Sequence, residues 1–336
     1  MEFTNIPNIK NKVSRIGLGT WVMGGSLWGG ANEKDSIAAI HQAIEKGINF
    51  IDTAPAYGKG ESEKVVGKAL KQLGKRDQII LATKFGLNQE TENVFRDSRK
   101  QSIKKEVEDS LRRLQVDYID LFQVHWPDPT TPIQETAETL KELLQQGKIR
   151  AIGVSNYSVE EMKEFKKYAP LHTSQPPFNI FEQEAENTIL AYCLKEEIAT
   201  IGYSGLARGL LSGKMTKDRK FKDDDLRKGM DPKFQEPRFS QYVNAADALK
   251  AWVKNKYQRP LIALAVRWVL DKKVNVSLWG ARNPEQLKDI DSVFGWKLND
   301  QDFKEIDKII GENVKDPIGP QFMAPPIRPN ALLKTR

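Results

Sequence analysis

Short apolar runs alternate along this chain with longer segments in which apolar and charged residues recur at helical spacing. The apolar runs predict eight strands, at residues 16–19, 50–53, 79–84, 119–124, 151–155, a short strand ending near Gln175, 199–202 and 274–279. The amphipathic segments predict helices at residues 36–46, 62–73, 102–114, 133–146, 159–168, 187–197, 261–270 and 284–293. This alternation is typical of a parallel sheet built from βα units.

Eight successive βα units favour a closed (β/α)8 TIM barrel over an open doubly wound sheet, which usually has about five or six strands. The open sheet would also carry a glycine fingerprint after its first strand. Here the third glycine of that fingerprint is missing, and the bulky Trp21 lies where the backbone would need to approach a cofactor closely. A P-loop is excluded as well, because Gly213 and Lys214 are followed by Met215 instead of Ser or Thr.

The 336 residues suggest two domains at about 150 residues each, but a barrel accommodates them as one domain spanning residues 1–336. We expect an N-terminal hairpin within residues 1–15 and a C-terminal extension at residues 300–336. The segment at residues 204–241, after the seventh strand, is too long for an ordinary βα turn and is therefore predicted to be a functional loop.

Charge and composition argue against a nucleic-acid-binding protein, a disulfide-rich protein, a metalloprotein and a membrane protein. The 52 Lys and Arg residues exceed the 45 Asp and Glu residues by seven, but both signs alternate along residues 104–114 and 160–168, which is typical of solvated helix faces and not of a nucleic-acid surface. One cysteine, Cys193, and three histidines argue against a disulfide framework and a metal centre. No stretch resembles a signal peptide or a membrane span, so we expect a cytoplasmic monomer with no membrane partner.

Four proton-active side chains follow successive predicted strands, where a barrel brings its strand ends together. Asp52 ends the second strand, Tyr57 lies in the next loop, and Lys84 and His125 end the third and fourth strands. A Lys84 ammonium can lower the pKa of a tyrosine, which is ordinarily about 10. Asp52 is suited to keep that ammonium charged, and His125 to orient a substrate oxygen. The set is therefore a candidate acid–base centre.

The chain resembles the aldo-keto reductases, in particular the bacterial branch that includes general stress aldo-keto reductases. The resemblance spans essentially the whole chain and rests on segments in the family's order, namely RIGLGTW, NFIDTAPAYG, ATKFG, DYIDLFQVHWPD, GKIRAIGVSNYS, RGLLSGK and the ending FMAPPIR. It implies NADPH-dependent reduction of aldehydes or other reactive carbonyls to alcohols, without a metal. Asp52, Tyr57, Lys84 and His125 would form the catalytic tetrad. Tyr57 would donate the proton, and Lys84 and Asp52 would lower its pKa.

The resemblance also implies a cofactor site. Ser155, Asn156 and Gln175 would bind the nicotinamide carboxamide, and Tyr203 would stack on the ring. The remaining cofactor candidates are Thr20, Trp21, Asp52, Ser204, Gly205, Leu206, Ala207, Arg208, Lys214, Arg227, Gly280, Ala281, Arg282 and Gln286.

The chain departs from the family pattern at the adenosine phosphate. Gly280, Ala281 and Gln286 replace the Lys-Ser pair and the Arg that many members present. Arg282 offers a guanidinium in the same loop, and guanidinium groups bind phosphate with two hydrogen bonds. NADPH is therefore expected, with NADH as the less favoured alternative.

The predicted substrate pocket is aromatic, with Trp21, Trp28, Trp126 and Phe322 as its walls and Met323 beside them. Such walls suit a small-molecule carbonyl substrate. Two other functions remain open. Lys84 could instead form a Schiff base in an aldolase-type barrel, although Asp52 favours the charged amine. The chain could also be a cofactor-sensing subunit without steady-state turnover.

Overall fold

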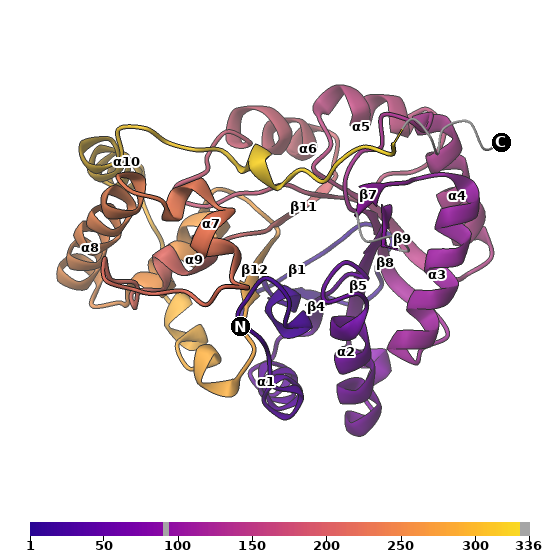
Figure 1. Cartoon of the computed structure of the whole chain (residues 1–336), viewed down its shortest axis with the longest axis horizontal. Coiled ribbons are helices and arrows are strands. Elements are labelled where there is room, and N and C mark those ends of the chain that lie inside the picture. The colour runs from indigo at the N-terminus through magenta and orange to yellow at the C-terminus, as the bar shows by residue number, and fades with distance from the viewer. Residues whose placement is uncertain (90–93, 330–336) are drawn as a thin grey trace.

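Eight parallel strands close into a barrel at the centre of the computed structural model, which describes residues 1–89 and 94–329 (Figure 1). The last strand, β12, pairs with the first, β3, and so closes the barrel; Ser277 lies opposite Ile16 in this pair. The predicted barrel and all eight predicted strands are confirmed. In chain order the strands are β3 (Ile16–Gly19), β4 (Phe50–Asp52), β5 (Ile80–Phe85), β8 (Ile119–Val124), β9 (Ile149–Ser155), β10 (Thr173–Gln175), β11 (Ala199–Gly202) and β12 (Val276–Gly280).

Seven of the predicted helices pack outside the barrel with small shifts at their ends. They are α1 (Glu33–Glu45), α2 (Glu61–Leu73), α3 (Lys100–Leu114), α4 (Ile133–Gln145), α5 (Val159–Lys166), α6 (Ala191–Lys195) and α9 (Leu261–Asp271). The helix predicted at 187–197 starts as a π-helical turn at Glu186–Leu190 before it continues as α6.

The helix predicted at residues 284–293 is wrong. This segment forms two separate 3-10 turns, η6 (Pro284–Leu287) and η7 (Ile290–Val293). The indole N–H of Trp279 donates to the carbonyl oxygen of Gln286 at 3.0 Å. That carbonyl is one that a continuous α-helix would use for its own ladder.

Two long helices were not predicted. The segment 204–241 is not one continuous loop, because it contains η4 (Ala207–Ser212), α7 (Leu226–Gly229), η5 (Pro232–Phe234) and the start of α8 (Arg238–Tyr257). The C-terminal extension begins with α10 (Asp300–Asn313), which packs against α8, and Asn299 and Asp302 form a capping box at its start. In Figure 1 both helices lie together at one end of the molecule.

Two small antiparallel pairs accompany the barrel. β1 (Phe3–Thr4) pairs with β2 (Val13–Ser14), which confirms the expected N-terminal hairpin. β6 (Leu87–Asn88) pairs with β7 (Phe95–Arg96) and was not predicted.

The barrel interior changes from apolar to polar along its strands. Phe50, Ile80 and Leu121 belong to one buried apolar cluster inside the barrel. Further along the same faces of these strands lie buried polar side chains: Asp52 and Gln123 two residues beyond Phe50 and Leu121, and Lys84 four residues beyond Ile80. A polar layer therefore covers the apolar core at the carboxyl ends of the strands.

The surrounding helices leave little free space where α2 crosses α3. A Cβ atom added to Gly67 of α2 would lie 2.7 Å from the carbonyl oxygens of both Arg113 and Leu114. These neighbours are backbone atoms at the end of α3, which cannot rotate away as a side chain would.

We expect Gly67→Ala to lower the free energy of unfolding by about 2 kcal/mol, because overpacking a tight contact forces backbone shifts. Gly311→Ala in α10 is the matched control, since no atom lies within 4 Å of its added Cβ. That control should be neutral or stabilising by up to about 1 kcal/mol through helix propensity. Urea unfolding followed by circular dichroism measures both; equal effects of the two variants would contradict the close-contact explanation.

Candidate active site

The barrel brings Asp52, Tyr57, Lys84 and His125 together at the carboxyl ends of its strands. Lys84 of β5 lies at the centre of the group. Its ammonium donates to Oδ1 of Asp52, to the carbonyl oxygen of Thr53 at 3.1 Å and to the phenol oxygen of Tyr57 at 3.1 Å. The rings of Tyr57 and His125 meet edge to face with centroids 5.8 Å apart.

Lys84 is held as a charged ammonium. Burial lowers its pKa, but Asp52 and then Tyr57 raise it, and the net pKa lies above the ordinary value. Each of its three N–H groups has an acceptor. Because Tyr57 accepts one of these hydrogen bonds, its own O–H remains available to donate elsewhere.

The pKa of Tyr57 differs from the sequence-based expectation, which was a net lowering by Lys84 and Asp52. Burial raises this pKa above its ordinary value; Lys84 opposes the change, and the negative charge of Asp52 adds to it. The expected net lowering is therefore wrong, because desolvation of the phenolate outweighs the one nearby ammonium, although Lys84 acts in the expected direction. Tyr57 is a protonated acid throughout the neutral range.

His125 is a neutral imidazole at neutral pH. Burial, followed by the positive charge of Lys84, lowers its pKa well below the ordinary value. Its backbone N–H donates to the carbonyl oxygen of Phe85 at 2.9 Å, and its own carbonyl accepts from the amide of Asn156 at 2.9 Å. These bonds tie the residue to both flanking strands.

A close backbone crossing fixes the loop that carries Tyr57. Gly58 has a φ of 68°, and a Cβ atom on it would lie 2.1 Å from the carbonyl oxygen of Gly24. Only glycine allows this approach without strain. The turn that contains Gly24, η1 (Trp21–Gly24), also places Trp21 against the Tyr57 ring, with centroids 5.9 Å apart.

The predicted nicotinamide-binding residues lie in one hydrogen-bonded network beside the tetrad. Tyr203 donates to the side-chain oxygen of Asn156 at 2.8 Å, and Ser155 donates to the carbonyl oxygen of Gln175 at 2.8 Å. The amide of Gln175 donates to Oδ2 of Asp52 at 2.9 Å. The network therefore connects β9, β10 and β11 to the catalytic candidates.

The segment after β11 turns sharply. Ser204, Ala207, Arg208 and Gly209 all have φ between 45° and 96°, and this kind of curvature can direct backbone N–H groups at an anion. Gly205 lies against β12, where its added Cβ would be 3.0 Å from the hydroxyl oxygen of Ser277. That buried hydroxyl has no hydrogen-bond partner among the described residues. Ala207 is buried and Leu206 is partly buried beside this turn.

The side chain of Arg208 points into the protein. Its guanidinium lies 3.2 Å from Asp231 and 3.6 Å from Glu182, and the Phe322 ring covers it with 5.0 Å between guanidinium and ring centre. Lys233 joins the same buried cluster, 2.7 Å from Glu182. Lys214, in contrast, is exposed at the surface.

Three loop segments contact one another: residues 27–30 after β3, residues 225–227 before and within α7, and Arg282 after β12. Leu226 donates its backbone N–H to the carbonyl oxygen of Leu27 at 3.0 Å. Arg227 pairs with Asp225 and lies over the Trp28 ring at 5.2 Å. Arg282, from the segment after β12, donates to the carbonyl oxygens of Trp28 at 2.7 Å and Gly30 at 2.6 Å.

The remaining cofactor candidates, Thr20, Gly280, Ala281 and Gln286, differ in burial and in hydrogen bonding. Gln286 accepts the backbone N–H of Arg282 at 2.8 Å, Gly280 is exposed, and Ala281 is buried. The hydroxyl of Thr20 is buried and donates to the carbonyl oxygen of Asp52 at 2.9 Å.

Of the aromatic candidates, Trp21 contacts the tetrad directly, through its stacking on Tyr57. Trp21 meets Trp28 edge to face at 5.0 Å, next to Tyr57. Trp126, directly after His125, lies under the guanidinium of Arg96 at 5.7 Å. Arg96 in turn donates to the carbonyl oxygen of Pro325 at 2.8 Å.

The C-terminal segment thereby reaches the predicted pocket. It includes η8 (Pro320–Met323), so it carries Phe322 and Met323. In Figure 1 this yellow segment runs from α10 past α6 and α5.

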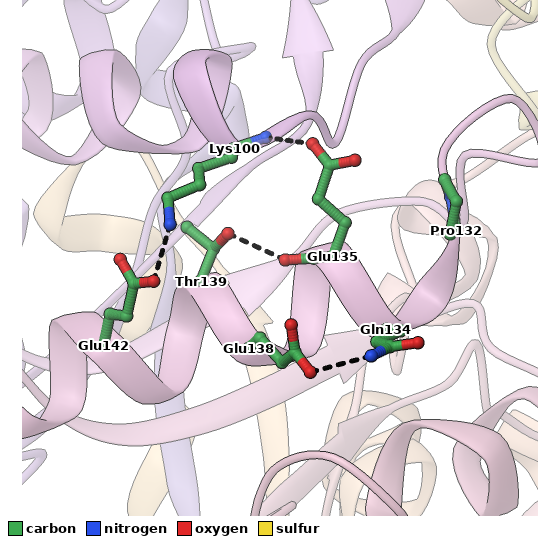
Figure 2. Close-up of a pocket in the computed structure, with 7 residues that line it drawn as sticks. All are labelled: Lys100, Pro132, Gln134, Glu135, Glu138, Thr139 and Glu142. Atoms are coloured by element: carbon green, nitrogen blue, oxygen red, sulfur yellow. Dashed lines mark hydrogen bonds and ion pairs between the residues drawn. The ribbon is translucent and has the colours of Figure 1, made fainter.

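A separate surface hollow has no part in this site. Figure 2 shows that it lies along α4 and that hydrogen bonds and ion pairs occupy its polar groups, such as Lys100 with Glu142 and Gln134 with Glu138. Within residues 1–89 and 94–329, no cluster of His, Cys, Asp and Glu side chains is arranged to hold a metal ion. The same part of the chain has no helix that could span a membrane.

Sequence reasoning missed Gln123. This residue of β8 is fully buried, and its amide donates to Oδ2 of Asp52 at 3.3 Å. The available signal was a polar residue within the apolar run of residues 119–124, two positions before His125.

Comparisons with known proteins identify relatives of the whole chain. The model of the aldo/keto reductase family matches residues 15–311. The aldo-keto reductase YhdN of Bacillus subtilis (strain 168) is 54% identical over 329 residues, which cover 98% of this chain and 99% of that protein. The NADH-specific methylglyoxal reductase of Escherichia coli (strain K12) is 36% identical over 308 residues, which cover 86% of this chain and 92% of that protein.

A solved structure shows the same architecture. The glycerol dehydrogenase AKR11B4 from Gluconobacter oxydans superimposes with a TM-score of 0.85 at 49% identity, covering 96% of this chain and 99% of that one.

We expect Lys84→Met to lower the free energy of unfolding by about 3 kcal/mol, because it leaves the buried Asp52 carboxylate without its counter-ion. Lys68→Met is the matched control, since the Lys68–Glu33 pair is exposed on both sides and solvent screens it. The control should leave the unfolding midpoint almost unchanged. Chemical denaturation of both variants measures the difference, and a Lys84→Met protein as stable as the control would contradict a buried charged pair.

Proposed function

Since the chain belongs to the aldo/keto reductase family, whose members are oxidoreductases of carbonyl compounds, we propose that it reduces aldehydes and other reactive carbonyls to alcohols with NADPH. The observation that carries this proposal is the Lys84–Tyr57 hydrogen bond, because it leaves the O–H of a protonated tyrosine free to donate.

In the proposed reaction Tyr57 transfers its proton to the carbonyl oxygen as negative charge develops there. Proton donation in the transition state avoids a free alkoxide and lowers the barrier. The ammonium of Lys84 stabilises the phenolate that remains on Tyr57, and Asp52 keeps Lys84 charged. The neutral imidazole of His125 donates a hydrogen bond that orients the same oxygen. The bound nicotinamide cofactor supplies the hydride that reaches the carbonyl carbon.

The residues present fit a nicotinamide dinucleotide. Ser155, Asn156 and Gln175 supply hydroxyl and amide groups next to Tyr57, which suits a carboxamide, and Tyr203 presents an aromatic ring beside them. The turn at residues 204–209 and the unpartnered hydroxyl of Ser277 suit a pyrophosphate. We propose that these groups hold the nicotinamide and the pyrophosphate of the cofactor, with Trp21 and Arg227 at the edge of the site.

NADPH preference is proposed from the charges around the adenosine end. Arg282 uses one terminal nitrogen for the carbonyls of Trp28 and Gly30, so its other nitrogens remain for a 2′-phosphate. The hydrogen bond from Lys288 lowers the pKa of Glu285 in the neighbouring turn, and the charge of Lys214 adds a smaller lowering, so Lys214 lies near that turn. The relative that is named NADH-specific makes NADH the alternative.

The substrate is proposed to be a small reactive carbonyl. Trp21, Trp28 and Trp126 offer apolar walls near Tyr57, and the relatives named for methylglyoxal and glycerol act on small oxygenated molecules. A Schiff-base reaction at Lys84 is disfavoured, because imine formation needs the free amine and all three N–H groups here are engaged as an ammonium. The cytoplasmic location and the monomeric state stay predictions.

We expect Tyr57→Phe to lose at least about a hundred-fold in kcat for carbonyl reduction, because general acid catalysis contributes on this scale. NADPH binding, followed by quenching of tryptophan fluorescence, should stay within about two-fold of the unchanged protein, since the hydroxyl is directed at the substrate. A variant with undiminished turnover across an aldehyde panel would exclude Tyr57 as the proton donor.

We expect Arg282→Ala to raise the KM for NADPH by about ten-fold or more while changing the KM for NADH little, because a charge-assisted bond to phosphate is lost. Lys288→Ala is the matched control: Lys288 lies in the same turn region, but it is exposed and paired with Glu285. Steady-state kinetics with both cofactors measures the ratio. Equal changes with NADPH and NADH would contradict a 2′-phosphate contact.

A further inference from the structure

Oδ2 of Asp52, the carboxylate oxygen that does not face Lys84, is bound by two side-chain amides. Gln175 donates to it at 2.9 Å and Gln123 at 3.3 Å. The two amides also contact each other, with 3.4 Å between Nε2 of Gln175 and Oε1 of Gln123. Asp52, Gln123 and Gln175 are each at most 1% exposed. Protein groups therefore solvate this half of the carboxylate.

The position of Gln123 is built into the barrel. On the neighbouring strand β9 lies Gly153, where an added Cβ would be 2.8 Å from Cγ of Gln123 and 2.2 Å from the hydroxyl oxygen of Thr173. The missing side chain at Gly153 makes room for the glutamine to reach Asp52. Leu121, on the same face of β8, belongs to the apolar cluster below.

The side-chain amides of Gln175 and Gln123 have different surroundings. Gln175 lies in the network with Ser155 that is proposed to hold the nicotinamide carboxamide. Gln123 meets that network only at its 3.4 Å contact with Gln175, and its link to Lys84 and Tyr57 runs through Asp52. A buried carboxylate is stabilised in proportion to the donors around it, and losing one donor leaves its charge less compensated.

We infer that Gln123 is a positioning residue for carbonyl reduction, which holds Oδ2 of Asp52 so that Oδ1 stays aligned on Lys84 and Lys84 on Tyr57. This inference rests on the proposed function. Its physical content is a chain of contacts from Gln123 to Asp52, from Asp52 to Lys84 and from Lys84 to the phenol oxygen of Tyr57.

The chain of contacts predicts the direction of a pH effect. The charged and titratable groups that face Tyr57 are Lys84, Asp52, His125 and Tyr203. Asp52 raises the pKa of Tyr57, while Lys84 lowers it. Without the Gln123 amide the Asp52 charge is less compensated, so the pKa of Tyr57 moves further up. Reduction needs protonated Tyr57, so the alkaline fall of kcat should move to higher pH.

The test compares Gln123→Met with Leu121→Met, a control on the same face of β8 that changes packing without touching Asp52. We expect Gln123→Met to lower kcat about ten-fold and to shift the alkaline limb upward by about half a pH unit, with NADPH affinity unchanged within about two-fold. Leu121→Met should keep the pH profile of the unchanged protein. A ten-fold loss without any shift, or profiles that coincide for both variants, would overturn the positioning role.

A second variant separates positioning from folding. Gln123→Glu retains the shape of the side chain, and a carboxyl group buried beside the Asp52 carboxylate is held protonated, so near neutral pH it can still donate to Oδ2. It should therefore recover most of the kcat that Gln123→Met loses, and a Gln123→Glu protein as slow as Gln123→Met would overturn the inference.

A measurement on the cofactor-free protein keeps the inference distinct from the proposed function. The ultraviolet absorbance of the tyrosine phenolates is titrated in the parent and in Gln123→Met, and the curve of the corresponding Tyr57→Phe background is subtracted from each, because the chain has eight tyrosines. The Tyr57 transition should lie at higher pH in Gln123→Met. If the parent protein reduces no carbonyl, the proposed function fails, but this titration still tests whether Gln123 acts on Tyr57 through Asp52 and Lys84. A Tyr57 transition at the same pH in both proteins would overturn the inference.

Discussion

The buried ion pair between Lys84 and Asp52 is the constraint on which the rest of the site depends. Both side chains are almost completely removed from water, so the pair is tolerable only because every remaining hydrogen-bonding position is filled. Thr53 and Tyr57 accept the other N–H groups of Lys84, while Gln123 and Gln175 donate to the free oxygen of Asp52. The barrel makes this possible, because its parallel strands β4, β5, β8 and β10 bring four polar side chains from distant parts of the sequence together near their carboxyl ends.

The fold was largely predictable because each βα unit has a local signature. Every barrel strand is a short apolar run, and seven helices show the expected periodicity. The errors arose where tertiary contacts replaced the local pattern. The indole of Trp279 captures a carbonyl that a helix at 284–293 would have used. Helix α8 has apolar positions at helical spacing, such as Phe239, Tyr242 and Val243, but its start lies in a segment expected to be a loop on grounds of topology alone.

The site was predictable in its residues and less so in its electrostatics. Asp52, Tyr57, Lys84 and His125 follow from their places at strand ends, because parallel strands bring those ends together. The direction in which the pKa of Tyr57 shifts depends on how completely Trp21 and its neighbours exclude water. No spacing in the sequence reveals this burial. Gln123 was overlooked for a related reason, since its importance comes from a contact with Asp52, 71 positions away along the chain.

Two arginines of the outer loops, Arg208 and Arg282, are each held by fixed partners, as the central pair is. Arg208 is committed to Glu182 and Asp231 beneath Phe322, so it stabilises the turn after β11 from inside, and its backbone faces the proposed pyrophosphate site. Arg282 instead donates to two backbone carbonyls, which are neutral, and the carboxylate near it, Asp225, is paired with Arg227. A guanidinium fixed in place by neutral acceptors loses little conformational entropy on meeting a phosphate. Of the two arginines, Arg282 is therefore the one suited to recognise the cofactor with its side chain.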